Sequence, residues 1–301
     1  MKRTKSNNKF HGNDSALSTV VGAVLVLGLL VTLTTTIQVS YVPAWKADAE
    51  YSHMSDVWRD MTSLKSNIDI LSAGLLISPD FNSMISVPIE MGGGDIPIIA
   101  AGKSSGMLSI NSKNCSMMVV ANNISGAVIY DSSSDLLQLG SISYSSNNNY
   151  YIDQMFEYEN GALIVVQNER SLMKLSPAIT VNRLDATNIS MVVSAVELIG
   201  DKRTKSSNTI EEIYLKSNTS SLLFSSSALV SDVSIIMSTN YPTAWAQYFN
   251  STAKRVDLVY GTDYSTTVDG TNVTFILTGS AGEDIQLHVQ KVTIDALVDV
   301  I

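Results

Sequence analysis

The sequence predicts an α+β protein with a long N-terminal helix, first transmembrane and then a stalk, followed by an antiparallel β-rich, sandwich-like domain outside the membrane. Three patterns along the 301 residues predict this architecture. The segment 15–45 carries no charged residue, and the next segment repeats apolar residues at spacings of three and four. Short β-prone runs separated by turn residues fill the rest of the chain.

The uncharged segment is long and apolar enough to cross a membrane as a helix, because a bilayer core needs roughly 20 such residues. In lipid every backbone N–H and C=O group must pair within the segment, which favours a helix. Four basic residues precede it, namely Lys2, Arg3, Lys5 and Lys9. Basic flanks stay in the cytoplasm, so the C-terminal bulk is expected outside the cell, with Tyr41 and Trp45 at the outer interface.

Two other interpretations of this segment stay open. A cleaved secretory signal needs a shorter apolar core and a nearby small-x-small cleavage site. The only such triplet close by, Ala47-Asp48-Ala49, lies well past the last apolar turn, so a retained helix is favoured. A buried core helix is the second alternative, but no polar side marks an outward face.

Composition agrees with an exported protein. Only 16% of the residues are charged, where about 25% is usual, and Ser, Thr and Asn take their place. The net charge of −9 argues against nucleic acid, whose phosphates require a basic surface, so no nucleic-acid partner is expected. Cys115 is the only cysteine, which rules out an intrachain disulfide and fits a prokaryotic exterior. It lies in an apolar run and is predicted to be a small buried residue.

The start of the apolar segment, DSALSTVVGAVL at 14–25, resembles the leader and helix start of archaeal type IV pilin-like proteins with a class III signal peptide. The resemblance implies a prepilin peptidase-like enzyme that cuts on the cytoplasmic side of the helix. The cut would fall near Ser15–Ala16 or Ala16–Leu17, with Gly12–Asn13 as the alternative.

Further along, the segments 158–165, 176–179 and 241–245, with the long strand that ends at Gly200, look like the central sheet of archaeal pilin-like domains. The resemblance implies a chain with a basic leader at 1–15, a transmembrane or filament-core helix at 16–40, a stalk helix at 41–74 and an extracellular β-rich domain at 75–301. Gly22, Ala23 and Gly28 would allow close helix packing in a filament core.

The predicted stalk helix is amphipathic. Pro43 should kink or restart the helix after the membrane segment. Beyond it, one apolar stripe runs through Met54, Val57, Met61, Leu64, Ile68 and Leu71. This pattern predicts a helix of about seven turns that ends near Gly74 and buries its stripe against the following domain.

After Gly74 the sequence predicts many strands. They are expected at 75–78, 116–120, 127–130, 162–166, 179–181, 189–193 and 233–237, with an edge strand at 96–99 and a hairpin of 266–268 with 273–277 around Asp269-Gly270. One more helix is predicted at 241–254, with Pro242 in its first turn. Its Trp245, Tyr248 and Phe249 share one side and are expected to pack in the core.

No pattern of catalytic, cofactor-binding or metal-binding residues is recognisable, so the protein is predicted not to be an enzyme and to need no cofactor. The histidines His11, His53 and His288 lack metal-ligand spacing, and neither a nucleophile elbow nor a phosphate-binding loop occurs. The acidic run 131–135 is predicted to be a solvated loop rather than a calcium site.

Six Asn-x-Ser/Thr sequences follow the membrane segment and are candidate N-glycosylation sites: Asn114, Asn123, Asn188, Asn218, Asn250 and Asn272. In a chain this rich in Ser, Thr and Asn, chance alone produces nearly as many.

The leading functional hypothesis is a pilin-like or pseudopilin-like surface subunit for adhesion or surface architecture, whose partners are membrane lipid, the processing peptidase and copies of itself or other pilin subunits. The alternative is a permanently anchored extracellular binding module that never polymerises. An anchored hydrolase is a third hypothesis, which would need a pocket around His288 or carboxylates.

Overall fold

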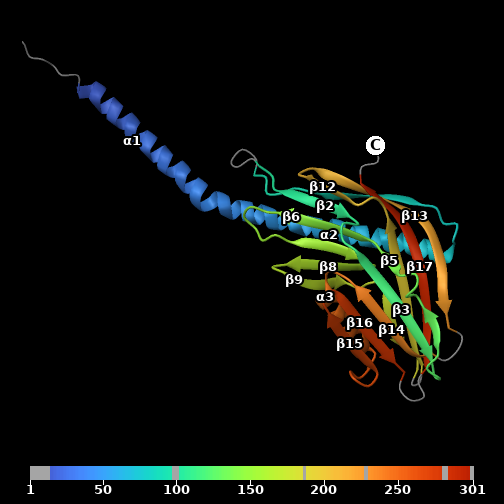
Figure 1. The fold of residues 1–301 in the computed structure, drawn as a ribbon. Helices are drawn as coiled ribbons and strands as arrows, with labels where there is room; N and C mark the ends of the chain where they lie inside the picture. The colour runs from blue at the N-terminus through green and yellow to red at the C-terminus, as the bar shows by residue number, and fades with distance from the viewer. Residues whose placement is uncertain (1–13, 97–101, 186–187, 227–229, 280–283, 299–301) are drawn as a thin grey trace, which may run out of the picture.

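The computed structural model describes residues 14–96, 102–185, 188–226, 230–279 and 284–298, with side chains from Thr19 onward. A helical rod leads into a β-rich domain and projects far beyond it (Figure 1). The rod consists of α1 (Asp14–Thr36), a π-helical turn η1 (Ile37–Tyr41) and α2 (Val42–Ile77). A third helix, α3 (Pro242–Arg255), lies within the β-rich domain. The predicted α+β class is confirmed.

The π-helical turn resolves the problem that Pro43 poses. Proline has no N–H to donate within a helix, and its ring clashes with the carbonyl one turn earlier. Here the Val42 N–H donates to the Ile37 carbonyl, which widens the turn just before the proline, and Pro43 then occupies the first turn of α2. The predicted restart is confirmed, and the rod changes direction at this junction (Figure 1).

The stalk helix α2 buries the predicted stripe, and all six of its predicted members are in the core. The predicted end at Gly74 and the predicted strand at 75–78 are wrong, because α2 continues to Ile77 and Leu75 extends the buried stripe. Gly74 serves packing instead: a Cβ atom there would lie 2.5 Å from the Phe81 ring. The glycine that indicated a helix end in the sequence instead leaves room for the Phe81 ring to pack against α2.

The strands form two sheets in the described part of the chain. The eleven-stranded sheet contains β1 (Met84–Glu90), β3 (Cys115–Asn123), β4 (Val128–Asp131), β5 (Leu137–Leu139), β10 (Ile179–Arg183), β11 (Asn188–Ile199), β13 (Ile210–Ser225), β14 (Val230–Ser238), β15 (Tyr264–Asp269), β16 (Asn272–Thr278) and β17 (Asp284–Val298). The six-stranded sheet has the order β12 (Arg203–Ser207), β2 (Ser105–Ile110), β6 (Ser141–Asn147), β7 (Met155–Glu159), β8 (Ala162–Gln167) and β9 (Arg170–Leu175).

Most of the predicted strands are confirmed, including the β15–β16 hairpin, whose turn holds Gly270 at φ 58°. The predicted strand at 96–99 falls mainly outside the described residues. Several strands were missed, among them β13, which is 16 residues long, and β1. Pro88 lies within β1, and β1 is an edge strand, where a residue without an N–H is tolerated.

One pairing departs from the predicted antiparallel arrangement. Strands β11 and β17 run parallel, from Asn188 opposite Asp284 to Ile199 opposite Asp295. In β11 the buried alternation changes phase between Ala195 and Val196, which are both buried. The two strands thus contribute to both hydrophobic clusters of the domain.

The helices α2 and α3 belong to different clusters. The stripe of α2 packs against strands of both sheets. The other cluster forms around α3, where Trp245 and Phe249 are buried and the Phe249 ring stacks on Phe275 at 4.8 Å between centroids. The prediction that the aromatic side of this helix packs in the core is confirmed, because Tyr248 is also buried.

Candidate functional site

The helix α1 is the most unusual surface of the protein. Its apolar side chains are exposed all around; Leu25 is 68% and Leu29 67% exposed. The most apolar stretch is not buried at all by the rest of the described chain, whereas the α2 stripe that follows is fully buried. The rod therefore carries one half built for a protein core and one half that needs another apolar environment.

Threonines near the end of α1 are also suited to an apolar environment. The Thr32, Thr34 and Thr36 hydroxyls donate to the carbonyls of Leu29, Leu30 and Thr32 at 2.8–2.9 Å. Each hydroxyl hydrogen is thus satisfied within the helix, which lowers the cost of removing it from water. With 23 residues, α1 is long and apolar enough to cross a membrane.

The predicted packing residues of α1 all belong to this exposed helix. A Cβ atom added to Gly22 or Gly28 would meet no described atom within 4 Å. Because successive helical residues are about 100° apart, Gly22, Ala23 and Gly28 lie on different sides of α1. Their role in close packing stays a prediction, and any such contacts would involve more than one neighbouring helix.

A buried carboxylate attaches the stalk to the β-rich domain. Glu50 of α2 is 1% exposed. Its two oxygens accept the backbone N–H groups of Asn149, Tyr150 and Tyr151, in the loop between β6 and β7, at 3.0, 2.8 and 2.7 Å. A carboxylate that accepts several backbone N–H groups is held firmly in one geometry. We call this contact the Glu50 clasp.

One turn further along α2, His53 is buried beside the same region. The Tyr144 hydroxyl donates to the Met91 carbonyl at 3.1 Å, so the His53 Nε2–H is assigned as the donor to the Tyr144 oxygen, also at 3.1 Å. Gly93 packs directly against the imidazole, since a Cβ there would lie 2.3 Å from His53 Cβ. Burial lowers the pKa of His53, opposed by the nearby carboxylates of Glu90, Asp56 and Asp60. The ring is therefore neutral in the folded protein near pH 7.

Acid is expected to destabilise the protein through His53. A lowered folded-state pKa means that the unfolded chain binds a proton that the folded chain does not, so stability is lost as the pH falls below about 6.5. The loss is at most about 1.4 kcal/mol per pH unit. We expect His53→Gln to flatten the dependence of the unfolding free energy on pH between 7 and 5. Parallel profiles for the two proteins in urea titrations would contradict this assignment.

The family comparison concerns the β-rich domain. A model of a family of unknown function, DUF7289, matches residues 104–296, from the start of the six-stranded sheet into β17. The chain belongs to the DUF7289 family. No curated protein and no solved structure matches it.

In this DUF7289 chain the predicted leader residues lie at one end of the rod. Ser15, Ala16 and Leu17 are in the first turns of the α1 backbone, and their side chains are outside the described part. The alternative junction, Gly12–Asn13, also lies outside the described residues. Processing stays a prediction.

The six candidate glycosylation sites are distributed over the DUF7289 domain. Asn114, Asn218 and Asn272 are exposed, whereas Asn123, Asn188 and Asn250 are half-buried. The Asn218 amide donates to Asp295 at 2.7 Å, and the Asn188 amide donates to Asp185 at 2.8 Å. Asn250 lies within the regular helix α3. On exposure alone, Asn114, Asn218 and Asn272 are the most accessible of the six, and glycosylation itself stays a prediction.

Like Glu50, two glutamates of β7 are buried and were not predicted to be. Glu157 and Glu159 of β7 are 1% and 2% exposed. Glu157 pairs with the Lys113 ammonium at 2.7 Å and accepts the Tyr241 hydroxyl at 2.8 Å. Glu159 accepts the Thr239 hydroxyl at 2.9 Å and the Trp245 indole N–H at 3.2 Å. Burial raises the pKa of Glu159, and the adjacent Glu157 acts in the same direction.

These glutamates attach the start of α3 to the six-stranded sheet. In the sequence Phe156-Glu157-Tyr158-Glu159 aromatic and acidic residues alternate, as in a strand with one face exposed to solvent. This pattern would place both glutamates on the solvent side, so their burial could not be predicted from it. Cys115 is buried beside them, as predicted, and burial raises the pKa of its thiol, helped by Glu159. In the described ranges, no three His, Cys, Asp or Glu residues gather closely enough to bind a metal ion.

The residues considered for hydrolysis or calcium binding make simple local contacts. His288 Nδ1 lies 3.0 Å from the Ser225 hydroxyl, a pair on the exposed surface of β13 and β17. In the acidic loop, the Asp131 carboxylate accepts the Ser133 N–H at 2.7 Å, which is a turn contact. The prediction that the chain is not an enzyme stays a prediction.

Proposed function

We propose that this DUF7289 chain is a pilin-like or pseudopilin-like surface subunit. In this proposal α1 spans the cell membrane, the β-rich domain lies outside the cell, and subunits assemble into filaments for adhesion or surface architecture. The observation that carries the proposal is the exposure of the apolar side chains of α1 in a rod whose second half, α2, buries its apolar stripe.

Energetics support an apolar partner for α1. Burying one Leu or Val side chain is worth about 1.5–3 kcal/mol, so a helix with this many exposed apolar residues strongly favours lipid or other helices over water. The same side chains can pass from lipid into a bundle of helices, because both environments are apolar. The four basic residues before α1 favour a cytoplasmic N-terminus.

The connection between rod and domain supports the part of the proposal in which subunits assemble into filaments. A subunit extracted from a membrane by its helix must transmit force to its globular part. The Glu50 clasp and the buried α2 stripe provide a connection that does not depend on a flexible linker. The resemblance of 14–25 to pilin-like leaders agrees with this role.

The test is N-terminal sequencing of the protein from sheared surface filaments and from membranes of the same cells. We expect the protein of the filament fraction to begin at Ala16 or Leu17, or at Asn13. In cells that lack the prepilin peptidase we expect the protein to retain Met1 and to stay in the membrane. Intact Met1 in every fraction, with the protein only in membranes, would contradict the proposal and favour the permanently anchored binding module.

A further inference from the structure

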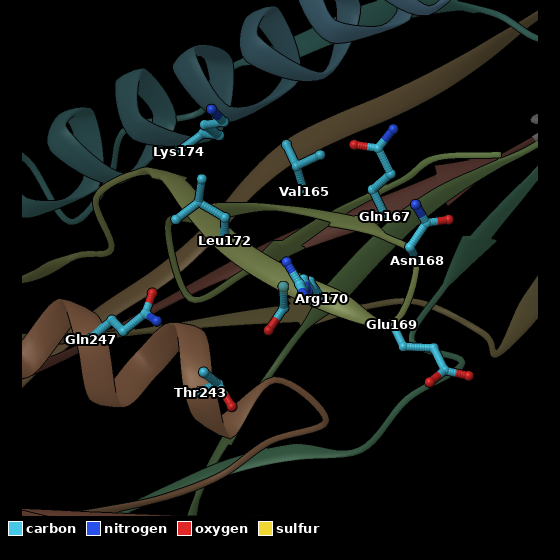
Figure 2. A pocket seen from close by; sticks show the side chains of 10 residues that line it. Val165, Gln167, Asn168, Glu169, Arg170, Leu172, Lys174, Thr243 and Gln247 are labelled. Carbon is cyan, nitrogen blue, oxygen red and sulfur yellow. The ribbon is translucent and has the colours of Figure 1, made fainter. Parts of the chain in front are cut away.

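A long trough runs along the outer strand of the six-stranded sheet, between α2 and α3. Its centre is a cavity of about 910 Å³ (Figure 2). Val165 and Lys174 are shared with a second cavity of about 380 Å³ beside α2. Leu172, Lys174 and Gln247 are shared with a third cavity of about 320 Å³ beside α3. The three cavities are therefore one continuous surface, which we call the α2–α3 trough.

The trough exists because α2 does not cover the whole face of the sheet. Strand β9 is one of the two edge strands of this sheet, and its Arg170, Leu172 and Lys174 are exposed while the residues between them are more buried. In Figure 2, Val165, Leu172 and Lys174 point from the sheet towards α2, and Thr243 and Gln247 come from α3 on the opposite side. The floor is thus apolar at its centre, and Leu172 is 47% exposed there.

The end of the trough beside α2 is aromatic. Tyr51 and Trp58 of α2 and Tyr151 of the β6–β7 loop line this end. Tyr51 is 54% exposed, and its ring meets that of Tyr151 edge-to-face at 5.5 Å. Exposed, rigidly held rings offer flat apolar faces beside polar edges. Such faces match the C–H surfaces of sugar rings.

The rest of the trough is polar and cationic. Lys174, Arg170 and Arg255 line it, against one acid, Glu169, which lies at the β8–β9 turn and points away in Figure 2. The side chains of Arg170 and Lys174 form no hydrogen bond or ion pair with another residue of the described ranges. On a chain of net charge −9, this is a local cationic surface, and these two cations have no side-chain partner among the described residues.

Amide side chains complete the lining. Gln167, Asn168 and Gln247 surround the central cavity, and Gln154 lies at the aromatic end. Each amide offers both donors and an acceptor, which is what a row of hydroxyl groups requires. The trough thus combines exposed aromatic faces, amide donors and acceptors, and two cationic side chains in one depression.

We propose that the α2–α3 trough binds a linear acidic polysaccharide, one chain lying from the aromatic end along β9 to α3. Sugar rings stack on Tyr51 and Tyr151, the amides bind hydroxyl groups, and Lys174 and Arg170 pair with carboxylate or sulfate groups. The inference deepens the adhesive role proposed above and rests on it for the placement of the trough at the cell surface.

The experiment measures binding to the full-length protein in lipid nanodiscs by calorimetry. The probes are hexagalacturonate and a sulfated dextran oligomer as acidic sugars, cellohexaose as a neutral sugar, and polyglutamate as an acidic polymer without sugar rings. We expect saturable binding of at least one acidic sugar, and affinities weaker by about tenfold or more for cellohexaose and polyglutamate.

Variants locate the binding. Tyr51→Ala and Lys174→Ala are each expected to weaken the acidic sugar by about tenfold, whereas Tyr51→Phe, which keeps the ring, changes it by less than about twofold. Matched controls outside the trough are the exposed Tyr260 and Lys216, each replaced by Ala. Thermal unfolding of each variant checks that the domain is intact.

Three results would overturn the proposal: no binding of either acidic sugar, equal binding of polyglutamate, or equal losses in the control variants. Equal binding of polyglutamate would indicate an acidic protein partner instead. Membrane retention and leader cleavage are measured separately, on membranes and filaments from cells, so failure of sugar binding and failure of the proposed surface role are separate outcomes.

Discussion

Replacing both Leu25 and Leu29 of α1 by lysine is expected to remove the protein from carbonate-washed membranes. Both side chains are exposed near the middle of the apolar helix. A lysine at the centre of a membrane helix costs about 2.5–3.5 kcal/mol, so the two together oppose insertion by about 5 kcal/mol or more. This corresponds to a change of more than about a thousandfold in partition. The fraction of protein in the washed pellet measures it.

The matched control is Gln38→Lys in the π-helical turn. Gln38 is exposed on the same rod but close to its interfacial end, where a lysine can extend its ammonium into water. We expect this variant to stay in the pellet like the wild type. Equal retention of the double variant would show that α1 is not held by lipid.

Removing the Glu50 carboxylate is expected to destabilise the attachment of the stalk strongly. In Glu50→Ala three part-buried hydrogen bonds from backbone N–H groups to the carboxylate are lost, and a hydrogen bond to a charged group is worth about 1.5–3 kcal/mol. We expect a loss of about 3 kcal/mol or more and a decrease in Tm on the order of 10 °C. Thermal unfolding in detergent micelles, followed by circular dichroism, measures the change.

Two variants control for this result. Asp48→Ala removes an exposed carboxylate two residues away on the same helix and should change stability by less than about 0.5 kcal/mol. Glu50→Gln keeps one acceptor oxygen, so an intermediate loss is expected. If Glu50→Ala behaved like Asp48→Ala, the clasp would contribute nothing to attaching the rod.

Regular patterns predicted much of the fold from local sequence. The spacing of Met54, Val57 and Met61 identified the buried face of α2, because residues three and four apart share one side of a helix. Runs such as 233–237 identified strands for the corresponding reason. The same reasoning failed at Gly74, because a glycine that favours helix ends can also make room for a ring.

Buried polar residues were beyond such patterns. Glu50 follows a helical segment of mixed polarity, and Glu157 alternates with aromatics in a short strand, so both resemble surface residues in the sequence. Their burial depends on donors from distant segments, 99 residues away for Asn149 and Glu50 and 84 for Tyr241 and Glu157. The α2–α3 trough was missed for the same reason, since its lining comes from α2, β8, β9 and α3.

By itself the sequence determined the apolar rod, the amphipathic stalk, the aromatic helix α3 and the general β-rich character of the remainder. All of these follow from repeats within one segment, where the backbone geometry sets which side chains share a face. Only the tertiary structure decided that β11 and β17 pair in parallel, that Glu50 holds the stalk, and that the rest of the described chain leaves α1 uncovered while it buries the α2 stripe. Those outcomes depend on which surfaces meet across long separations in the chain, and no local repeat encodes that choice.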